Sequence, residues 1–170
     1  MRLIGLLNKI VIYFFLTSGN LVGNDAFTYV YLLPFDNIQN DSSIDWISVG
    51  LIDMAKQELK DKYGIRLKDK NDLEIVMNDR SLMLKQPIGS RNILILGKYN
   101  RQLDRINVNM QAVDVATWEE LGKSQISESY TKIPALNRAV GRSISEMLQP
   151  FLPIQKQTKK SPFTSLTIPK

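Results

Sequence analysis

The sequence predicts a two-layer α/β protein with a mixed five-stranded sheet and three helices, in the order βαβαβββα. Two segments, residues 28–35 and 92–99, are apolar at nearly every position, which is typical of strands buried on both faces. Other segments carry apolar residues at helical spacing, and the chain contains no internal repeat. Such strands, in a chain with three helices, favour a sheet with helices packed on one or both faces.

The first strand, residues 28–35, should end at Pro34, because proline has no N–H to donate to a sheet ladder. A polar loop follows it. The first helix begins at Ser42 and Asp45, whose spacing resembles a capping box, and Gly64 is placed to close it. Its apolar residues recur every three or four positions and form one stripe: Ile47, Leu51, Met54, Ala55 and Leu59.

A short strand and a weaker helix come next. Residues 65–68 alternate between apolar and charged side chains, as a strand does. Asn71 or Asp72 caps the second helix, which extends towards Leu84. A loop that contains proline and glycine then leads to residue 92.

The last part of the domain is predicted as an antiparallel meander followed by a helix. Residues 92–99 are its first strand, and residues 105–115 alternate so that one face is buried and the other solvated. Residues 123–130 are polar and are expected at the edge of the sheet. The helix, residues 133–148, has a stripe formed by Ile133, Leu136, Val140, Ile144 and Met147 or Leu148.

Both ends of the chain differ in composition from the domain at residues 26–150. Residues 1–23 have the order of a secretory signal peptide, with basic residues, an apolar run at 10–16 and then small residues. That run is shorter than the about 20 residues of a membrane-spanning helix, and an uncleaved N-terminal anchor is the alternative. Residues 151–170 are rich in Lys, Pro, Ser and Thr, and are expected to be a disordered basic tail or linker.

Cysteine content and charge limit the location and the partners. The chain has no cysteine, which excludes disulfides and a lipid-bearing cysteine and suits the Gram-negative periplasm. The net charge of +5 comes from the ends, because 17 acidic residues stand against 16 basic ones between Asp25 and Glu146. A domain that binds nucleic acid concentrates positive charge on its folded surface, so no nucleic-acid partner is expected.

The residues available for catalysis are few. The chain has no histidine, so Ser–His–Asp and Cys–His centres are excluded and zinc loses its common ligands. No phosphate-binding or dinucleotide-binding glycine motif is present. Carboxylates cluster around two loops, with a spacing that matches helix capping and no calcium loop: Asp36, Asp41, Asp45, Asp69, Asp72 and Glu74. We expect no enzymatic activity, no cofactor and no metal site; an envelope hydrolase with two facing carboxylates is an alternative.

Three features are candidates for binding. Trp118 lies in a polar turn, and exposed tryptophan is enriched at protein interfaces. Ile126 lies in the predicted edge strand, which is either a solvated edge or a site where a partner peptide adds a strand. A pocket lined by Asp36, Asn37 and Arg91 is expected if the protein senses a small ligand. Trp46, at the start of the first helix, is expected as a core residue or a hydrophobic staple, and a binding contact is the alternative.

The order and spacing of several segments resemble the TolB amino-terminal-like domain family, which includes FlgO-like and CsgG-like envelope proteins. Residues 30–37 (VYLLPFDN) are similar to the family's opening strand, V-x-x-L-P-F-x-N, and residues 93–99 (ILILGKY) to its y-v-l-x-G-x-y strand. Residues 106–121 follow its hairpin, and the helix at 136–148 fits as well. Trp118 stands where the family's hairpin usually has glycine.

This resemblance implies a two-layer fold, a periplasmic or outer-membrane-associated location and a role in envelope assembly, motility or secretion. It implies no catalytic residues. The first hypothesis is therefore a non-enzymatic, exported module that binds another envelope protein or a peptide and associates peripherally with the outer membrane. The second hypothesis is a periplasmic domain that senses a small ligand or a peptide.

Overall fold

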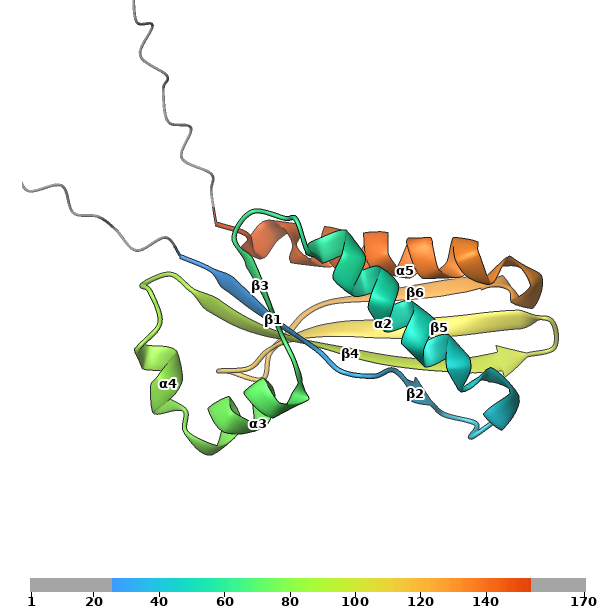
Figure 1. Cartoon of the computed structure of the whole chain (residues 1–170), viewed down its shortest axis with the longest axis horizontal. Helices are drawn as coiled ribbons and strands as arrows, with labels where there is room; N and C mark the ends of the chain where they lie inside the picture. Colours follow the sequence, from blue (N-terminus) through green and yellow to red (C-terminus); the bar gives the residue numbers. More distant parts are fainter. Residues whose placement is uncertain (1–25, 154–170) are drawn as a thin grey trace, which may run out of the picture.

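The computed structural model describes residues 26–153 and contains a six-stranded mixed sheet with helices on both sides (Figure 1). The predicted signal peptide and most of the predicted tail lie outside the described residues. The elements are β1 (Thr28–Leu32), β2 (Asp36–Asn37), η1 (Ser42–Ile44), α2 (Trp46–Leu59), β3 (Ile65–Lys68), α3 (Lys70–Asn78), α4 (Ser81–Leu84), β4 (Arg91–Gln102), β5 (Arg105–Asp114), β6 (Glu120–Ser129), η2 (Tyr130–Lys132), α5 (Ile133–Leu148) and η3 (Gln149–Phe151).

The strand order is β3-β1-β4-β5-β6, and the short β2 also pairs with β4. β1 runs parallel to both β3 and β4, whereas β4, β5 and β6 form an antiparallel meander. The predicted mixed α/β sheet and its meander are therefore confirmed. The additional strand, β2, occupies the start of the predicted polar loop, where Asp36 and Asn37 pair with Lys98 and Tyr99.

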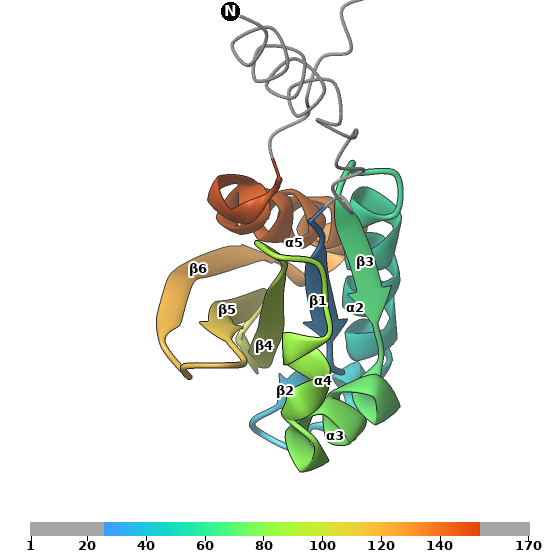
Figure 2. The same ribbon diagram turned by 90° about the vertical axis from the view of Figure 1, so that its left-hand side faces the viewer.

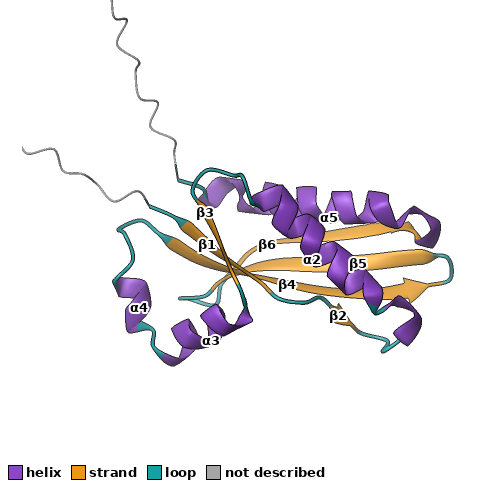
Figure 3. Cartoon of the chain, viewed as in Figure 1, coloured by secondary structure: helices purple, strands orange, loops and turns teal. Residues whose placement is uncertain are grey.

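Two hydrophobic clusters lie on opposite faces of β1 and β4. The larger cluster packs α2 and α5 against one face of the sheet, and Figures 2 and 3 show both helices on that side. The smaller cluster packs Leu73 and Val76 of α3 against Tyr31 and Leu94 on the other face. Both faces of β1 and of the first half of β4 are covered, as the apolar runs at Val30–Leu32 and Ile93–Ile95 predict.

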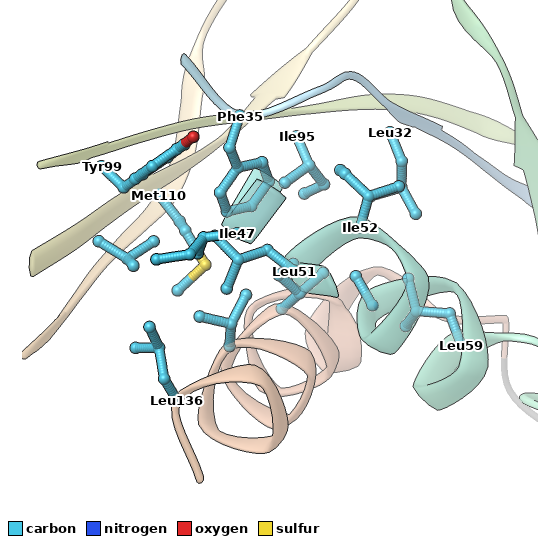
Figure 4. Packing of buried hydrophobic residues seen from close by; sticks show 14 of the residues in the cluster. Leu32, Phe35, Ile47, Leu51, Ile52, Leu59, Ile95, Tyr99, Met110 and Leu136 are labelled. Carbon is cyan, nitrogen blue, oxygen red and sulfur yellow. The ribbon is translucent and has the colours of Figure 1, made fainter. Parts of the chain in front are cut away.

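Phe35 lies in the larger cluster, beneath the second half of β4 (Figure 4). It stands opposite Gly97: a Cβ atom at Gly97 would lie 2.5 Å from three carbons of the Phe35 ring. Ile47 and Leu51 of α2 lie in the same region (Figure 4). The glycine in the family-like strand therefore makes room for an aromatic side chain of the core.

The helix starts differ from the predictions. Asp45 has helical backbone angles and no capping hydrogen bond, and the carboxylate of Asp41 accepts from the backbone N–H of Ser43 instead. The second helix begins earlier than predicted, because Asp69 caps it and forms a capping box with Asp72. It ends at Asn78, and α4 is a separate short helix.

Two further positions correct the sequence analysis. Trp46, expected in the core, is 53% exposed, and its ring N–H donates to the carbonyl of Ser43 at 3.0 Å. Phe151 and Leu152, assigned to the tail, pack against the larger cluster, and the carbonyl of Phe151 accepts a 2.7 Å hydrogen bond from the Thr28 hydroxyl. None of the helices within residues 26–153 has the length and apolar character needed to cross a membrane.

Candidate functional site

A hollow of about 300 Å³ lies between α4, the start of β4 and the β5–β6 turn; we call it the α4 hollow. Figure 1 shows α4 and this turn at the same end of the molecule. Exposed apolar side chains surround it: Leu84 lines it and is 87% exposed, and Ile88 in the neighbouring loop is fully exposed. Its lining residues are Met83, Leu84, Gly89, Ser90, Arg91, Asn92, Asp114 and Ala116.

A network of buried polar groups holds the floor of the α4 hollow. The side-chain amides of Asn92 and Gln86 exchange two hydrogen bonds, of 2.7 and 3.2 Å, and the Tyr31 hydroxyl donates to Asn92 Oδ1 at 2.9 Å. Burial raises the pKa of Tyr31 to about 12, and the nearby charge of Asp72 adds to the effect. The hydroxyl therefore keeps its proton at neutral pH and fixes the loop between α4 and β4 to the sheet.

The β5–β6 turn forms one wall of this region and carries Trp118. The Asp114 carboxylate accepts from the backbone N–H groups of Ala116 (2.8 Å) and Thr117 (3.2 Å), and the Trp118 N–H donates to the Asp114 carbonyl at 2.8 Å. Trp118 has φ = +62° and is 49% exposed. The sequence placed this tryptophan at a glycine-favoured position, and the positive φ confirms that reading.

Trp118 combines two costs to folding. Left-handed backbone costs an L-residue energy that glycine avoids, and an exposed indole leaves part of its apolar surface in water. Local features that disfavour folding are expected at functional sites. The turn therefore marks this end of the molecule as a candidate site.

A second, larger hollow of about 520 Å³ lies on the sheet and is lined by residues of β2, β4, β5 and β6; we call it the sheet-face hollow. The strand register aligns its polar side chains in rows, because Lys98 pairs with Asn109 and Asn109 with Gln125, while Gln111 pairs with Lys123. Its lining residues are Asp36, Leu96, Gly97, Lys98, Asn109, Met110, Gln111, Glu120, Lys123, Ser124 and Gln125. It offers many hydrogen-bonding groups and charges of both signs.

The predicted site residues divide between two regions. Arg91 lines the α4 hollow, with its guanidinium 5.5 Å from the centre of the Phe151 ring, and Trp118 lies in the turn beside that hollow. Asp36 lines the sheet-face hollow and pairs with Lys98, whereas Arg91 begins the same strand. The pocket expected from Asp36, Asn37 and Arg91 therefore does not form.

Two of the predicted residues have clear structural roles. The amide N–H₂ of Asn37 donates to the Asp41 carbonyl (2.8 Å) and to the Asp45 carboxylate (2.7 Å), which ties β2 to the start of α2. Ile126 is half-buried and packs against the larger cluster, opposite Val108. The edge position predicted for its strand is confirmed, because β6 ends the sheet and pairs only with β5 among the described strands.

The clustered carboxylates act as hydrogen-bond acceptors in turns and caps. Hydrogen bonds from Ser43 and Ser81 hold the pKa values of Asp41 and Asp79 below the usual carboxyl range, and the Lys68 ammonium does the same for Asp72. Within residues 26–153, no three acidic side chains gather as metal ligands would. Asp41, Asp69 and Asp72 cap helix starts as their spacing indicated, whereas the Asp45 carboxylate accepts from Asn37.

Met83 and Leu84 line the α4 hollow, although the sequence pattern did not indicate them as site residues. Both residues were predicted at the end of a longer helix. Instead, α3 ends at Asn78, and the short α4 presents Leu84 to solvent. The signal for this site in the sequence was the apolar run from Leu82 to Leu84, which has no second apolar run next to it in the chain to cover it.

No family model matches the chain, and no curated protein matches it. Among solved structures, TolB from Acinetobacter baumannii superposes with a TM-score of 0.51 at 15% identity, over 74% of this chain and 29% of the TolB chain. The PelC dodecamer from Paraburkholderia phytofirmans (TM-score 0.44, 13% identity, 82% and 96% of the two chains) and the LpoB C-terminal domain from Escherichia coli (0.41, 15%, 63% and 86%) are more distant.

The comparison with TolB defines the class of fold. This chain is an α/β protein with a TolB-like fold, and it spans less than a third of the length of the TolB structure. At this identity the similarity extends to the fold alone. The FlgO-like and CsgG-like branches of the predicted resemblance remain predictions.

Proposed function

We propose that this protein is a non-enzymatic, exported module of the cell envelope that binds another protein or a peptide at the α4 hollow. The observation that carries the proposal is the β5–β6 turn, where Trp118 is half-exposed on left-handed backbone beside an apolar hollow. Tryptophan is among the residues that dominate the binding energy of protein interfaces, and Trp118 lies in this turn.

The shape and composition of the α4 hollow support a protein or peptide as the ligand. Leu84 and Ile88 offer exposed apolar surface around the hollow, above its polar floor, and Asp114 adds a negative charge at its wall. Exposed apolar surface of this kind marks sites of protein interaction. The polar network below it, from Tyr31 to Gln86, holds the surface in one arrangement before the partner arrives.

The signal peptide predicted at residues 1–23 and the TolB-like fold support an envelope location. Fractionation of cells that express the full chain tests it. Recovery with periplasmic or membrane-associated markers is expected, and recovery in the cytosol contradicts the proposal.

Affinity capture from envelope extract tests the binding site. Trp118→Ala is expected to lose the partner that the wild type retains, whereas the matched control Trp46→Ala retains it, because Trp46 is similarly exposed but lies at the start of α2. Equal recovery by Trp118→Ala and the wild type removes the α4 hollow from the interface. If only the wild type retains the partner, a photo-crosslinking residue placed at position 84 identifies the partner segment that contacts the α4 hollow.

The sheet-face hollow supports the second candidate function, the sensing of a small polar ligand or a peptide. Its rows of amide and lysine side chains, from Lys98 to Gln125, can hydrogen-bond to an extended polar ligand. Substituting Asn109→Leu, together with a matched Asn107→Leu control outside the lining, separates this function from the first. Loss of the captured partner in Asn109→Leu but not in Trp118→Ala favours the sheet-face hollow.

A further inference from the structure

The long edge strand of the sheet, β6, carries backbone groups that the domain itself does not use. The other edge strand, β3, has four residues, whereas β6 has ten and pairs only with β5 among the described strands. Figure 2 shows β6 as the outermost ribbon beside β5. An exposed edge of this length presents a row of N–H and C=O groups with which another strand can pair.

The ladder between β5 and β6 determines which of these groups face outwards. Opposite residues of an antiparallel pair alternate between hydrogen-bonded and non-hydrogen-bonded pairs. The Tyr130 N–H donates to the Asp104 carbonyl at 2.6 Å, and these two residues continue the register of the ladder. Their pair is therefore of the hydrogen-bonded type. It follows that the N–H and C=O groups of the odd-numbered residues from 123 to 129 point away from β5.

Side chains of this chain close one end of that edge. The Arg105 guanidinium donates to the Ser127 carbonyl at 2.8 Å, and the Ser129 N–H donates to the Glu128 carboxylate at 3.3 Å. At the other end, a bulge early in β6 interrupts the regular ladder. Charged side chains and bulges are devices with which proteins block edge strands. They leave an open segment, residues 123–127, which we call the β6 window.

The β6 window is fixed to α5 and has one apolar side. The Ser143 hydroxyl donates to the Ser124 hydroxyl at 2.7 Å, which ties the strand to the helix. Ile126 lies on the same side of the strand and is half-buried against the larger cluster. Lys123 and Gln125 lie on the opposite side and are exposed. An apolar side chain placed beside Ile126 would therefore cover its exposed part, whereas polar side chains suit the other side.

We propose that the β6 window binds an extended segment of a partner protein, which adds an antiparallel strand to the sheet. An extended main chain supplies donors and acceptors at the same spacing as the outward groups of Lys123 and Gln125. The segment alternates in character, with an apolar side chain beside Ile126 and polar side chains beside Gln125. This contact is additional to the proposed function and does not depend on the α4 hollow.

A second copy of β6 fits the window less well than such a segment. If the window paired with itself along its full length, Lys123 of one chain would lie opposite Ser127 of the other, whose carbonyl is already held by Arg105. Registers shifted towards the end of β6 meet further closed groups. Registers shifted towards its start bring the two Lys123 side chains next to or opposite each other, and like charges in these positions destabilise a sheet.

Peptides enriched on the wild-type full chain from a random library displayed on phage are the probes that test the window. Gln125→Pro removes an outward N–H that the fold does not use, and an edge strand tolerates proline at such a position. This variant is expected to bind the probes about tenfold more weakly, because a main-chain hydrogen bond is lost. The matched control, Gln125→Ala, keeps the N–H and is expected to bind them like the wild type. Circular dichroism checks that both variants are folded.

Amide hydrogen exchange of the wild-type full chain shows the geometry of binding without any variant. With a probe at about ten times its Kd, exchange at Lys123, Gln125 and Ser127 is expected to slow about tenfold. The amides of Ser124 and Ile126 already bond to β5, so their exchange is expected to stay unchanged. This alternation separates an added strand from a probe that covers the surface in another way.

Three results overturn the proposal. The first is that no enriched peptide slows exchange at the odd-numbered amides of the window, or that odd and even amides slow alike. The second is that a folded Gln125→Pro binds the probes as tightly as the wild type. The third is that the odd-numbered amides are already protected in the full chain alone: protection that grows with concentration identifies a second copy as the occupant, and protection that does not identifies another segment of the same chain.

Discussion

Substituting Gly97→Ala places a methyl group against the Phe35 ring. The new Cβ would lie 2.5 Å from three ring carbons, whereas carbon atoms in contact are about 3.5–4.0 Å apart. The ring is buried among Ile47, Ile95 and Tyr99 of the larger cluster, so it has no open space to enter (Figure 4). Relief requires a shift of about 1 Å of a rigid side chain or of the strand.

Overpacking of this kind costs about 1–3 kcal/mol, which corresponds to a decrease in Tm of roughly 4–10 °C for a domain of this size. Thermal unfolding by circular dichroism and the urea midpoint, at unchanged m-value, measure it. Gly122→Ala is the control, because its Cβ would meet Met147 at 3.8 Å, an ordinary contact distance.

A double-mutant cycle with Phe35→Ala separates the steric clash from a change in strand propensity. Alanine lacks the Cγ and Cδ carbons that the new methyl group meets, so the double variant should be more stable, by about 1 kcal/mol, than the sum of the two single effects indicates. A Gly97→Ala protein with the Tm of the wild type, or two strictly additive effects, would refute the reasoning.

Three further predictions concern the ends of elements and the buried network. Gly64→Ala should destabilise the domain by about 2 kcal/mol, because its φ is +78° and its Cβ would lie 2.6 Å from Pro153 Cδ. Gly89→Ala is the control, because Gly89 has φ = +86° but its Cβ would meet only Ala26 Cβ, at an ordinary contact distance of 3.6 Å. Equal urea midpoints for the two variants contradict the role of Pro153. The Lys68 ammonium lowers the folded-state pKa of Asp72. The stability that this ion pair contributes is therefore present above the unfolded carboxyl pKa and is lost as pH falls through the folded value. The urea midpoint of Asp72→Asn should change less between pH 6 and pH 2 than that of the wild type, and equal changes refute the assignment. Tyr31→Phe removes the hydrogen bond to Asn92 and should cost about 1 kcal/mol of stability at pH 7. The difference in stability between the two proteins should shrink as pH rises from 10 to 12, because a raised folded-state pKa gives stability that is present below the unfolded pKa and is lost as pH rises towards the folded value. A difference that does not change with pH contradicts this.

The C-terminal helix and the β5–β6 turn show how far local sequence extends. The predicted helix from Ile133 to Leu148 agrees with α5 at both ends, because its apolar stripe has one period and proline follows it. The family resemblance placed Trp118 where glycine is usual in a turn, and its backbone there is left-handed. Both features depend on interactions between residues close in the chain.

The helix starts were less predictable, although they too are local. Several Asp and Ser residues compete to cap each helix, and the spacing alone did not choose among them. Asp41 caps the short η1, and α2 starts at Asp45 without a side-chain cap. The Asp45 carboxylate is held by Asn37 of β2 through a 2.7 Å hydrogen bond, a contact with another element that local spacing does not show.

The sequence by itself determined the fold class, because two uniformly apolar strands and two amphipathic helices have few ways to bury their surfaces. It also indicated Trp118 and Arg91 as candidates. Only the tertiary structure decided that these two residues lie at the same end of the molecule, that Asp36 lies elsewhere and that Leu84 and Leu103 remain in solvent. Exposure and proximity depend on which distant segments cover each residue, and the periodicity of one segment carries no record of its neighbours in space.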